Sequence, residues 1–416
     1  MRTSGQLGMA VLAAGALVLS GCTTAAAHHD QQPAWSAAWS SAPQRPSAGF
    51  GPNWSEQGFS DQTLRQVVRL TNGGDQVRIR LSNHYGLGPL EVTGSTVAAT
   101  DTGAAITATT LHPLTFAGTS KVTIPAGAEL TSDPAPLHVT QLENVTVTLY
   151  LRATTGPATF HSQAWTDSYL ATGDHLSDPA AAAFAAHTNS WYYLTDVEVA
   201  GPAPRRDTVV AFGDSITDGF ASTPRADHRW PDQLADRLVH ADRQRAVLDE
   251  GIGGNLMLND SAWYGDRAST RFSHDVLDKP GVRSVILLEG VNDLGFSETD
   301  QPTYKPDPDV SAAQVITGYQ NLITQAHNKG IRIIGATLLP FGGSDHYSAR
   351  SATKRHAINE WIRTSGQFDA VVDFAAAVTD ATNPEILAPA YDSGDHLHPN
   401  DAGYHAMAEA INIATL

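Results

Sequence analysis

Hydrophobic and polar positions follow two different periods along the chain and divide it into two halves. In the first half, residues 76–81 and 144–151 alternate polar and apolar side chains at a period of two, which is typical of half-buried β-strands. Residues 72–75, Asn-Gly-Gly-Asp, form a strong turn signal before the first of these segments. Short strands joined by segments rich in Gly, Pro and Thr predict an antiparallel β-sandwich, jelly-roll-like, over residues 34–201.

The second half alternates short apolar runs with longer segments of helical periodicity. Residues 284–288 are almost entirely apolar, as expected for a strand that is covered on both faces. Five such strands separated by helices predict a parallel sheet in a three-layer α/β/α domain with right-handed crossovers over residues 207–416. The run Gly-Pro-Ala-Pro-Arg-Arg at 201–206 marks the boundary, because proline disfavours regular pairing there. The predicted strands are 208–212, 246–249, 284–288, 331–338 and 370–374, and the predicted helices are 230–241, 267–277, 311–329, 348–364 and 402–413.

The N-terminus reads as a targeting segment rather than as part of the fold. Arg2 precedes an apolar run at 7–19 of the length found in signal peptides. The following Leu-Ser-Gly-Cys, which ends at Cys22, resembles a bacterial lipobox, in which the cysteine becomes the lipidated first residue. Cys22 is the only cysteine of the chain, which favours this interpretation over a signal peptide with an incidental cysteine. We therefore expect residues 1–22 to be a lipoprotein signal, 23–33 to be a flexible tether, and the protein to be extracytoplasmic, membrane-anchored through Cys22 or secreted.

The composition excludes one class of partner and supports two folded domains. With 416 residues, 41% of them hydrophobic and 17% charged, the chain can bury two cores. Its formal net charge of −17 repels a nucleic acid backbone, so nucleic acid is not expected as a partner. Beyond the N-terminal run no segment is apolar for long enough to span a bilayer, and a single cysteine cannot form an internal disulfide.

Candidate chemistry follows the predicted parallel strands, at the sheet edge where such folds bind ligands. Ser215 follows the first strand at a strand-to-helix turn, where a helix N-terminus favours negative charge. Gly254 belongs to a glycine-rich loop after the second strand, and glycine lets a backbone N–H approach a ligand closely. That loop fits neither the Walker A spacing nor the dinucleotide-binding spacing. Asn292 follows the third strand, and its amide can donate to a developing oxyanion.

The loop before the last helix holds two acid–histidine combinations. Asp395 and His398 are three residues apart, a spacing that can place a carboxylate against the imidazole to fix its tautomer and stabilise its charged form. Asp392 is a fallback for that acid. A zinc site formed by Asp392, His396 and His398 is the rival interpretation. No second cluster of ligands is evident, so we expect neither a metal nor a cofactor.

Together these loops supply a nucleophile, a base with its acid, and hydrogen-bond donors, which is the set that ester hydrolysis requires. Residues 208–411 resemble the SGNH/GDSL hydrolase superfamily, with its first, second, third and fifth sequence blocks at Gly213-Asp214-Ser215, Gly254, 290–293 and 395–399. The resemblance implies a flavodoxin-like α/β/α domain in which Ser215 is the nucleophile, His398 the base and Asp395 its partner. It also implies that the Ser215 N–H, the Gly254 N–H and the Asn292 side chain hold the oxyanion. Gly254 is preferred to Gly253 because it precedes an asparagine, as the family glycine precedes Asp or Asn.

The stretch 392–404, with the β-rich half in front, is similar to the XynE-like subgroup of arylesterases and acylhydrolases, which are often associated with plant polysaccharide degradation. The resemblance implies an acyl ester substrate, with short acyl groups on an acetylated polysaccharide as first candidate. A lipase or lysophospholipase is the alternative, although the polar loops at 301–304 and 342–345 weigh against long acyl chains. An O-acyltransferase or a glycan-binding lipoprotein is the third hypothesis. In the β-rich half, loops 83–86 and 161–167 gather polar and aromatic groups. They are either a wall of the ester site or a platform on which sugars stack, or else ordinary turn and core residues.

Overall fold

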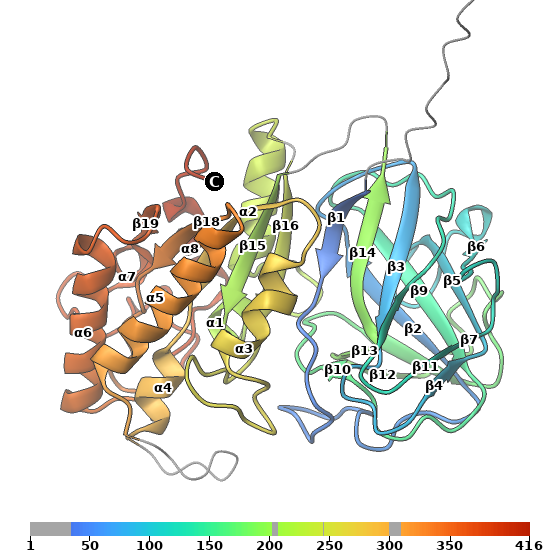
Figure 1. Cartoon of the computed structure of the whole chain (residues 1–416), viewed down its shortest axis with the longest axis horizontal. Coiled ribbons are helices and arrows are strands. Elements are labelled where there is room, and N and C mark those ends of the chain that lie inside the picture. The colour runs from blue at the N-terminus through green and yellow to red at the C-terminus, as the bar shows by residue number, and fades with distance from the viewer. Residues whose placement is uncertain (1–34, 202–206, 244, 299–308) are drawn as a thin grey trace, which may run out of the picture. The chain divides into compact units, whose positions relative to one another are not determined.

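The computed structural model describes residues 35–201, 207–243, 245–298 and 309–416 (Figure 1). The predicted signal and tether with Cys22, the boundary at 202–206 and the polar loop at 301–304 lie outside the described residues. Within the described ranges, no helix combines the length and the apolar character that a bilayer crossing would require.

The first half of the chain folds into two antiparallel sheets, as its period-two pattern predicts. In β3, Val77, Ile79 and Leu81 are fully buried while the polar residues between them are partly exposed. These three side chains share one apolar core with Val147 of β9, which lies in the other sheet. The turn at 72–75 therefore joins two layers, β2 to β3, instead of closing a hairpin. The six-stranded sheet has the order β12 (Ala186–Thr188), β11 (Ser168–Thr172), β2 (Gln62–Arg69), β9 (Asn144–Leu151), β5 (Gly94–Ala99), β6 (His112–Pro113), and the four-stranded sheet has the order β1 (Trp35–Ser40), β14 (Leu194–Ala200), β3 (Gln76–Ser82), β8 (Glu129–Thr131).

Smaller elements complete this sandwich. They are the strand pair β10 (Phe160–His161) with β13 (Trp191–Tyr192), the pair β4 (Leu90–Val92) with β7 (Val122–Ile124), and the short helix η1 (Ala108–Thr110).

The second half forms a five-stranded sheet in which every strand pair is parallel. The chain runs from β15 to the edge strand β16 and then returns to β17 on the other side of β15, which is the flavodoxin-like strand order. The connections after β15 and β17 therefore leave the sheet in opposite directions and open a crevice at its carboxyl edge. The order is β16 (Ala246–Gly251), β15 (Thr208–Gly213), β17 (Val282–Leu288), β18 (Arg332–Ala336), β19 (Ala370–Val372).

Helices pack beside this sheet in two groups, α2 with α8 and α7, and α5 with α6 and α3 (Figure 1). Their ends follow local signals: Ser311 caps α5 by accepting the N–H of Gln314 at 3.3 Å, and Gly330 after it has φ +70°. The predicted helix at 267–277 is divided into an α-helical and a π-helical turn. The last strand is shorter than predicted, because Asp373 caps the next helix by accepting the N–H of Ala376 at 3.1 Å. The helices are α1 (Ser215–Asp218), α2 (Trp230–His240), α3 (Ala268–Phe272), η2 (Ser273–Leu277), α4 (Val291–Phe296), α5 (Ala312–Asn328), α6 (Ala349–Thr364), α7 (Phe374–Val378) and α8 (Asp401–Ala410).

Buried polar contacts hold the sandwich against the edge strand β16. Lys279 is 6% exposed, and its ammonium lies 2.8 Å from Asp196 of the sandwich and 2.9 Å from Glu250 of β16. The hydroxyl of Ser40 donates to the same Glu250 carboxylate. Removing one partner of such a buried pair leaves an uncompensated charge, so breaking any one of these contacts is costly.

Candidate active site

Ser215 begins α1 directly after β15, at the carboxyl edge of the parallel sheet. Gly213 makes the turn possible, because a Cβ at this position would lie 2.2 Å from the carbonyl oxygen of Leu288. Asp214 caps the short helix by accepting the N–H of Ile216 at 3.0 Å. The serine side chain is thus held in a nearly buried position, 5% exposed, at the crevice.

The structure brings the predicted base and acid to this serine. Ser215 Oγ lies 2.8 Å from His398 Nε2, and His398 Nδ1 lies 2.6 Å from Asp395 Oδ2. The other oxygen of Asp395 accepts the N–H groups of Leu397 and His398, both at 2.9 Å. Burial favours the neutral acid, but the hydrogen bond and charge of His398 hold the pKa of Asp395 well below its usual range. Asp395 is therefore ionised at neutral pH, and it orients the ring so that Nε2 can accept the serine proton.

Asp392 and His396 form a separate pair. His396 Nδ1 lies 2.6 Å from Asp392 Oδ2, so the fallback acid is already engaged by another ring. The two histidines of the rival zinc set thus face different partners. In the described parts of the chain, no group of three or more His, Cys, Asp or Glu side chains is arranged to hold a metal ion.

The predicted oxyanion residues line the same cavity of about 480 Å³ as Ser215 and His398. Gly254 has φ +76°, and a Cβ there would lie 2.4 Å from the ring of Tyr264, so only glycine fits. The Asn292 amide donates from Nδ2 to the carbonyl of Asn255 at 2.9 Å, which ties α4 to the glycine loop. Nδ2 carries a second hydrogen, and Asn292 lines the cavity.

His346 fixes the other end of the Asn292 amide and was missed in the sequence, where nothing distinguishes a lone histidine in a loop. Its Nε2 lies 3.1 Å from Asn292 Oδ1. Burial, and then the nearby charge of His398, lower the pKa of His346 to about 4. A neutral ring that donates to Oδ1 holds the amide in the one orientation that turns its nitrogen toward the glycine loop and the cavity.

The lowered pKa of His346 predicts a specific pH dependence of stability. As the pH falls from about 6.5 to about 4, the unfolded chain binds a proton on this histidine that the folded protein does not. Folding free energy is therefore lost over this window, by about 3 kcal/mol. The variant His346→Gln lacks this histidine and should not lose this free energy. In urea unfolding, the difference in free energy of unfolding between wild type and variant should therefore decrease by about 3 kcal/mol from pH 7 to pH 4. A difference that stays constant over this pH range for His346→Gln would contradict the role of its lowered pKa.

Aromatic rings form one wall of the cavity, and the sandwich contributes to it. Phe50 stacks on Tyr264 at 5.7 Å between centroids, and Tyr264 stacks on Phe296 at 5.4 Å. Phe220 packs on the His398 ring at 4.3 Å. Phe50 is 44% exposed and lies far from any motif, so sequence reasoning missed it. The Tyr264 ring closes the cavity on the side of Gly254.

The loop at 161–167 reaches from the sandwich to the glycine loop. His161 Nε2 donates to Asp218 Oδ1 at 3.2 Å, and Asp218 Oδ2 accepts the N–H of Gly253 at 3.0 Å. His161 Nδ1 faces the carbonyl of Ala42 at 2.9 Å, so both ring nitrogens point at acceptors. Although burial disfavours the charged ring, Asp218 raises the pKa of His161, and the ring carries both protons. A buried ion pair between His161 of the sandwich and Asp218 of α1 thereby positions the loop that presents the Gly254 N–H.

This contact predicts that a change in the sandwich impairs chemistry in the other half. His161→Gln keeps a donor to one acceptor but loses the charge that holds Asp218, so the glycine loop should shift. Displacements of about 1 Å at a reacting centre cost up to about 10²-fold. We expect kcat for p-nitrophenyl acetate to fall about ten- to hundredfold with KM nearly unchanged. Partly exposed His112→Gln, in the edge strand β6, should retain wild-type kcat, and equal kcat for both variants would refute the positioning role.

The chain is similar to known proteins in sequence and in structure. The sequence model of the GDSL-like lipase/acylhydrolase family matches residues 211–406. No curated protein matches the chain. Similar solved structures include the acetyl xylan esterase AlAXEase, at 23% identity over 50% of this chain and 100% of that one with a TM-score of 0.39. A GDSL-like lipase from Bacteroides thetaiotaomicron is 20% identical over 52% of this chain and 91% of that one, with a TM-score of 0.36. A variant of an acetyl-xylooligosaccharide esterase from a Geobacillus is 22% identical over 50% of this chain and 92% of that one, with a TM-score of 0.38. At these TM-scores the solved structures are no more than similar to this chain. Among the comparisons, only the family-model match over residues 211–406 enters the argument below.

Proposed function

We propose that the protein is an ester hydrolase of the GDSL-like lipase/acylhydrolase family, whose sequence model matches residues 211–406, and that Ser215 is its nucleophile. One observation carries the proposal: the unbroken chain of short contacts from Ser215 Oγ through His398 to Asp395, at 2.8 and 2.6 Å. This chain opens into a cavity that Gly254 and Asn292 also line. A nucleophile, a base, an orienting acid and oxyanion donors thus surround one position for an acyl carbon.

The proposed mechanism has two half-reactions. Ser215 Oγ attacks the ester carbonyl while His398 Nε2 takes its proton, and Asp395 stabilises the imidazolium. The tetrahedral oxyanion accepts hydrogen bonds from the Ser215 and Gly254 N–H groups and from Asn292 Nδ2. His398 then protonates the leaving alcohol, and water repeats the cycle on the acyl-enzyme, which returns the free acid and the serine.

The substrate that we propose is a short acyl ester, such as an acetyl group on carbohydrate. The Tyr264 ring lies against Gly254 and limits the space for an acyl chain beside the oxyanion donors. At the mouth, Ser344 and Asp345 supply polar groups that suit a hydroxylated alcohol better than a lipid. These polar residues belong to one of the two loops that weigh against a lipase; the other lies outside the described residues.

A chain-length series of p-nitrophenyl esters, run beside acetylated xylan and lysophosphatidylcholine, tests the substrate class. We expect kcat/KM to fall from acetate to octanoate and acetate to be released from the xylan. A lipase would bury each added CH₂ with a gain of about 0.8 kcal/mol, so its kcat/KM would rise along the series. A maximum at octanoate or beyond, with cleavage of the lysophospholipid, would establish the alternative. Acyl transfer to an added alcohol in preference to water would establish the transferase.

We also propose that the enzyme acts outside the cytoplasm, anchored through a lipid on Cys22. The support is the Leu-Ser-Gly-Cys sequence after the apolar run, together with the absence of any other cysteine. Cys22→Ser should move the protein from the membrane fraction to the soluble fraction. Unchanged membrane association would rule out this anchor.

A further inference from the structure

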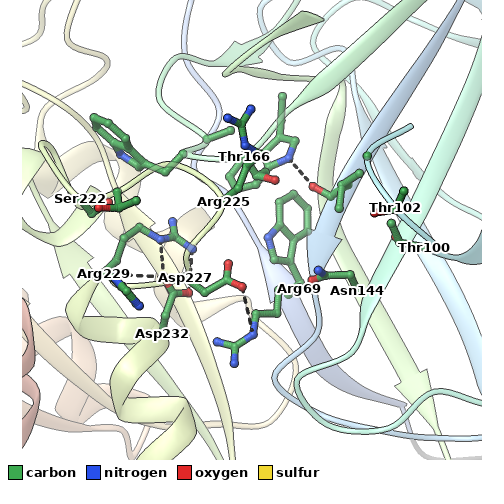
Figure 2. A pocket seen from close by; sticks show the side chains of 18 of the residues that line it. Arg69, Thr100, Thr102, Asn144, Thr166, Ser222, Arg225, Asp227, Arg229 and Asp232 are labelled. Carbon is green, nitrogen blue, oxygen red and sulfur yellow. Dashed lines mark hydrogen bonds and ion pairs between the residues drawn. The ribbon is translucent and has the colours of Figure 1, made fainter. Parts of the chain in front are cut away.

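A second cavity, of about 220 Å³, lies between loops of the sandwich and the segment that joins α1 to α2 (Figure 2). Thr100, Thr102 and Asn144 line it from the sandwich, and Ser222 and Asp227 line it from the other half. Neither Ser215 nor His398 lines it, so it is distinct from the ester site. Pockets for drug-sized ligands usually have volumes of about 300–1,000 Å³, so this smaller cavity suits a ligand of about one ring.

Three buried polar atoms of this lining have no hydrogen-bond partner within the described protein. They are Arg69 Nη1, Trp165 Nε1 and Ser222 Oγ. Ser222 is 2% exposed, so its hydroxyl is cut off from bulk water. Buried polar groups are normally satisfied, and all three of these atoms can donate. The lining is therefore complementary to a ligand rich in hydrogen-bond acceptors.

Backbone strain is concentrated in the same walls. Trp165, Arg225 and Asp227 have φ values of +52°, +65° and +53°, a region that side chains other than glycine rarely adopt. The Arg225 N–H donates to the carbonyl of Trp165 at 2.7 Å, which joins the two walls directly. Strained residues persist where the surrounding structure fixes them, and they cluster at ligand sites.

The arginines that line the cavity are already paired, which argues against an anionic ligand. Arg69 lies 2.7 Å from Asp236, and Arg225 lies 2.7 Å from Asp167. Arg229 lies 2.7 Å from Asp232 and 3.0 Å from Asp249. Each guanidinium is thus already paired with a carboxylate, so the cavity has no spare positive charge for a phosphate or a carboxylate ligand.

Aromatic rings complete the lining: Trp39, Trp165, Tyr169 and Trp191. Such rings offer apolar faces beside polar groups, which matches the alternating C–H faces and hydroxyl edges of a pyranose. We propose that this cavity binds a single neutral sugar unit. Trp165 also contacts Phe220 at 5.9 Å, and Phe220 packs on His398, so the bound unit lies one aromatic layer away from the ester site. The assignment rests on the cavity and does not require Ser215 to be the nucleophile.

Binding of neutral oligosaccharides to the full chain carrying Ser215→Ala tests this assignment. The probes are xylotriose, cellotriose and mannotriose, with glucuronate and inorganic phosphate as charged comparisons, followed by saturation-transfer NMR and calorimetry. Thr102 lines the cavity on an exposed loop, so Thr102→Trp should block it without disturbing a core. The matched control is Thr107→Trp, which places the same ring at an exposed position outside the lining.

We expect at least one neutral probe to bind, Thr102→Trp to weaken its Kd at least tenfold, and Thr107→Trp to leave it within twofold. Absence of binding by all three sugars would overturn the assignment. Equal binding by the two tryptophan variants would do so as well, because the sugar would then occupy another site. Preference for phosphate or glucuronate would overturn the neutral class. Hydrolysis of p-nitrophenyl acetate by the protein with Ser215 intact reports separately on the proposed esterase.

Discussion

Replacing His398 with alanine should lower kcat for p-nitrophenyl acetate by about 10⁶-fold, the loss that follows removal of the base from a serine triad. The reason is the contact between His398 Nε2 and Ser215 Oγ at 2.8 Å, since no other imidazole in the described structure is within hydrogen-bonding distance of that oxygen. Without the ring the hydroxyl keeps its proton at neutral pH and is a weak nucleophile. Steady-state kinetics with a long incubation can follow the residual rate.

The same loop provides the matched control, His396→Ala. His396 has a carboxylate partner of its own in Asp392, at 2.6 Å, but it has no contact with Ser215. We expect this variant to lose less than about tenfold in kcat. Equal losses for the two histidines would mean that the loop as a whole matters and that His398 is not the base.

Replacing Asn292 with alanine should lower kcat by about 10²–10³-fold with a small change in KM, as removal of one oxyanion donor does. The amide is anchored at both ends, by Asn255 through Nδ2 and by His346 through Oδ1, so its orientation is fixed before substrate arrives. A preorganised donor stabilises the developing charge at no further cost of reorganisation. The effect should therefore appear in the chemical step and not in binding.

Exposed Asn328→Ala, at the end of α5, serves as the control for the same substitution. It should retain wild-type kcat and a wild-type melting temperature. If Asn292→Ala raises KM and leaves kcat unchanged, Asn292 binds substrate instead of the oxyanion. If the variant unfolds, Asn292→Gln and its melting curve distinguish loss of fold from loss of the donor.

The convergence of the candidate site could be predicted because its residues lie in connections that follow strands of a parallel sheet, and such strands end at a common edge. Ser215 and Asn292 follow the adjacent strands β15 and β17, and local signals already mark those strand ends. Helix ends were predictable for the same reason, since caps such as Ser311 act within a few residues. Strand ends and helix caps both depend on interactions between residues that are close in the sequence, so the sequence alone shows them.

Residues that reach the site by tertiary packing could not be predicted. His346 and Phe50 belong to no motif, and their contacts with Asn292 and Tyr264 depend on how distant segments pack. The role of the 161–167 loop stayed open for the same reason, because periodicity does not show that His161 meets Asp218. The turn at 72–75 shows the limit for the sheets: a pattern can place a turn without showing which strands will pair.

The most direct test of the account is covalent labelling of the resting enzyme with diethyl p-nitrophenyl phosphate, followed by intact-mass and peptide mass spectrometry. We expect one diethylphosphoryl group per chain, located on Ser215, with esterase activity lost in proportion to labelling. His398→Ala should react far more slowly. Loss of activity with the label on another residue, or full activity in a protein labelled at Ser215, would contradict it.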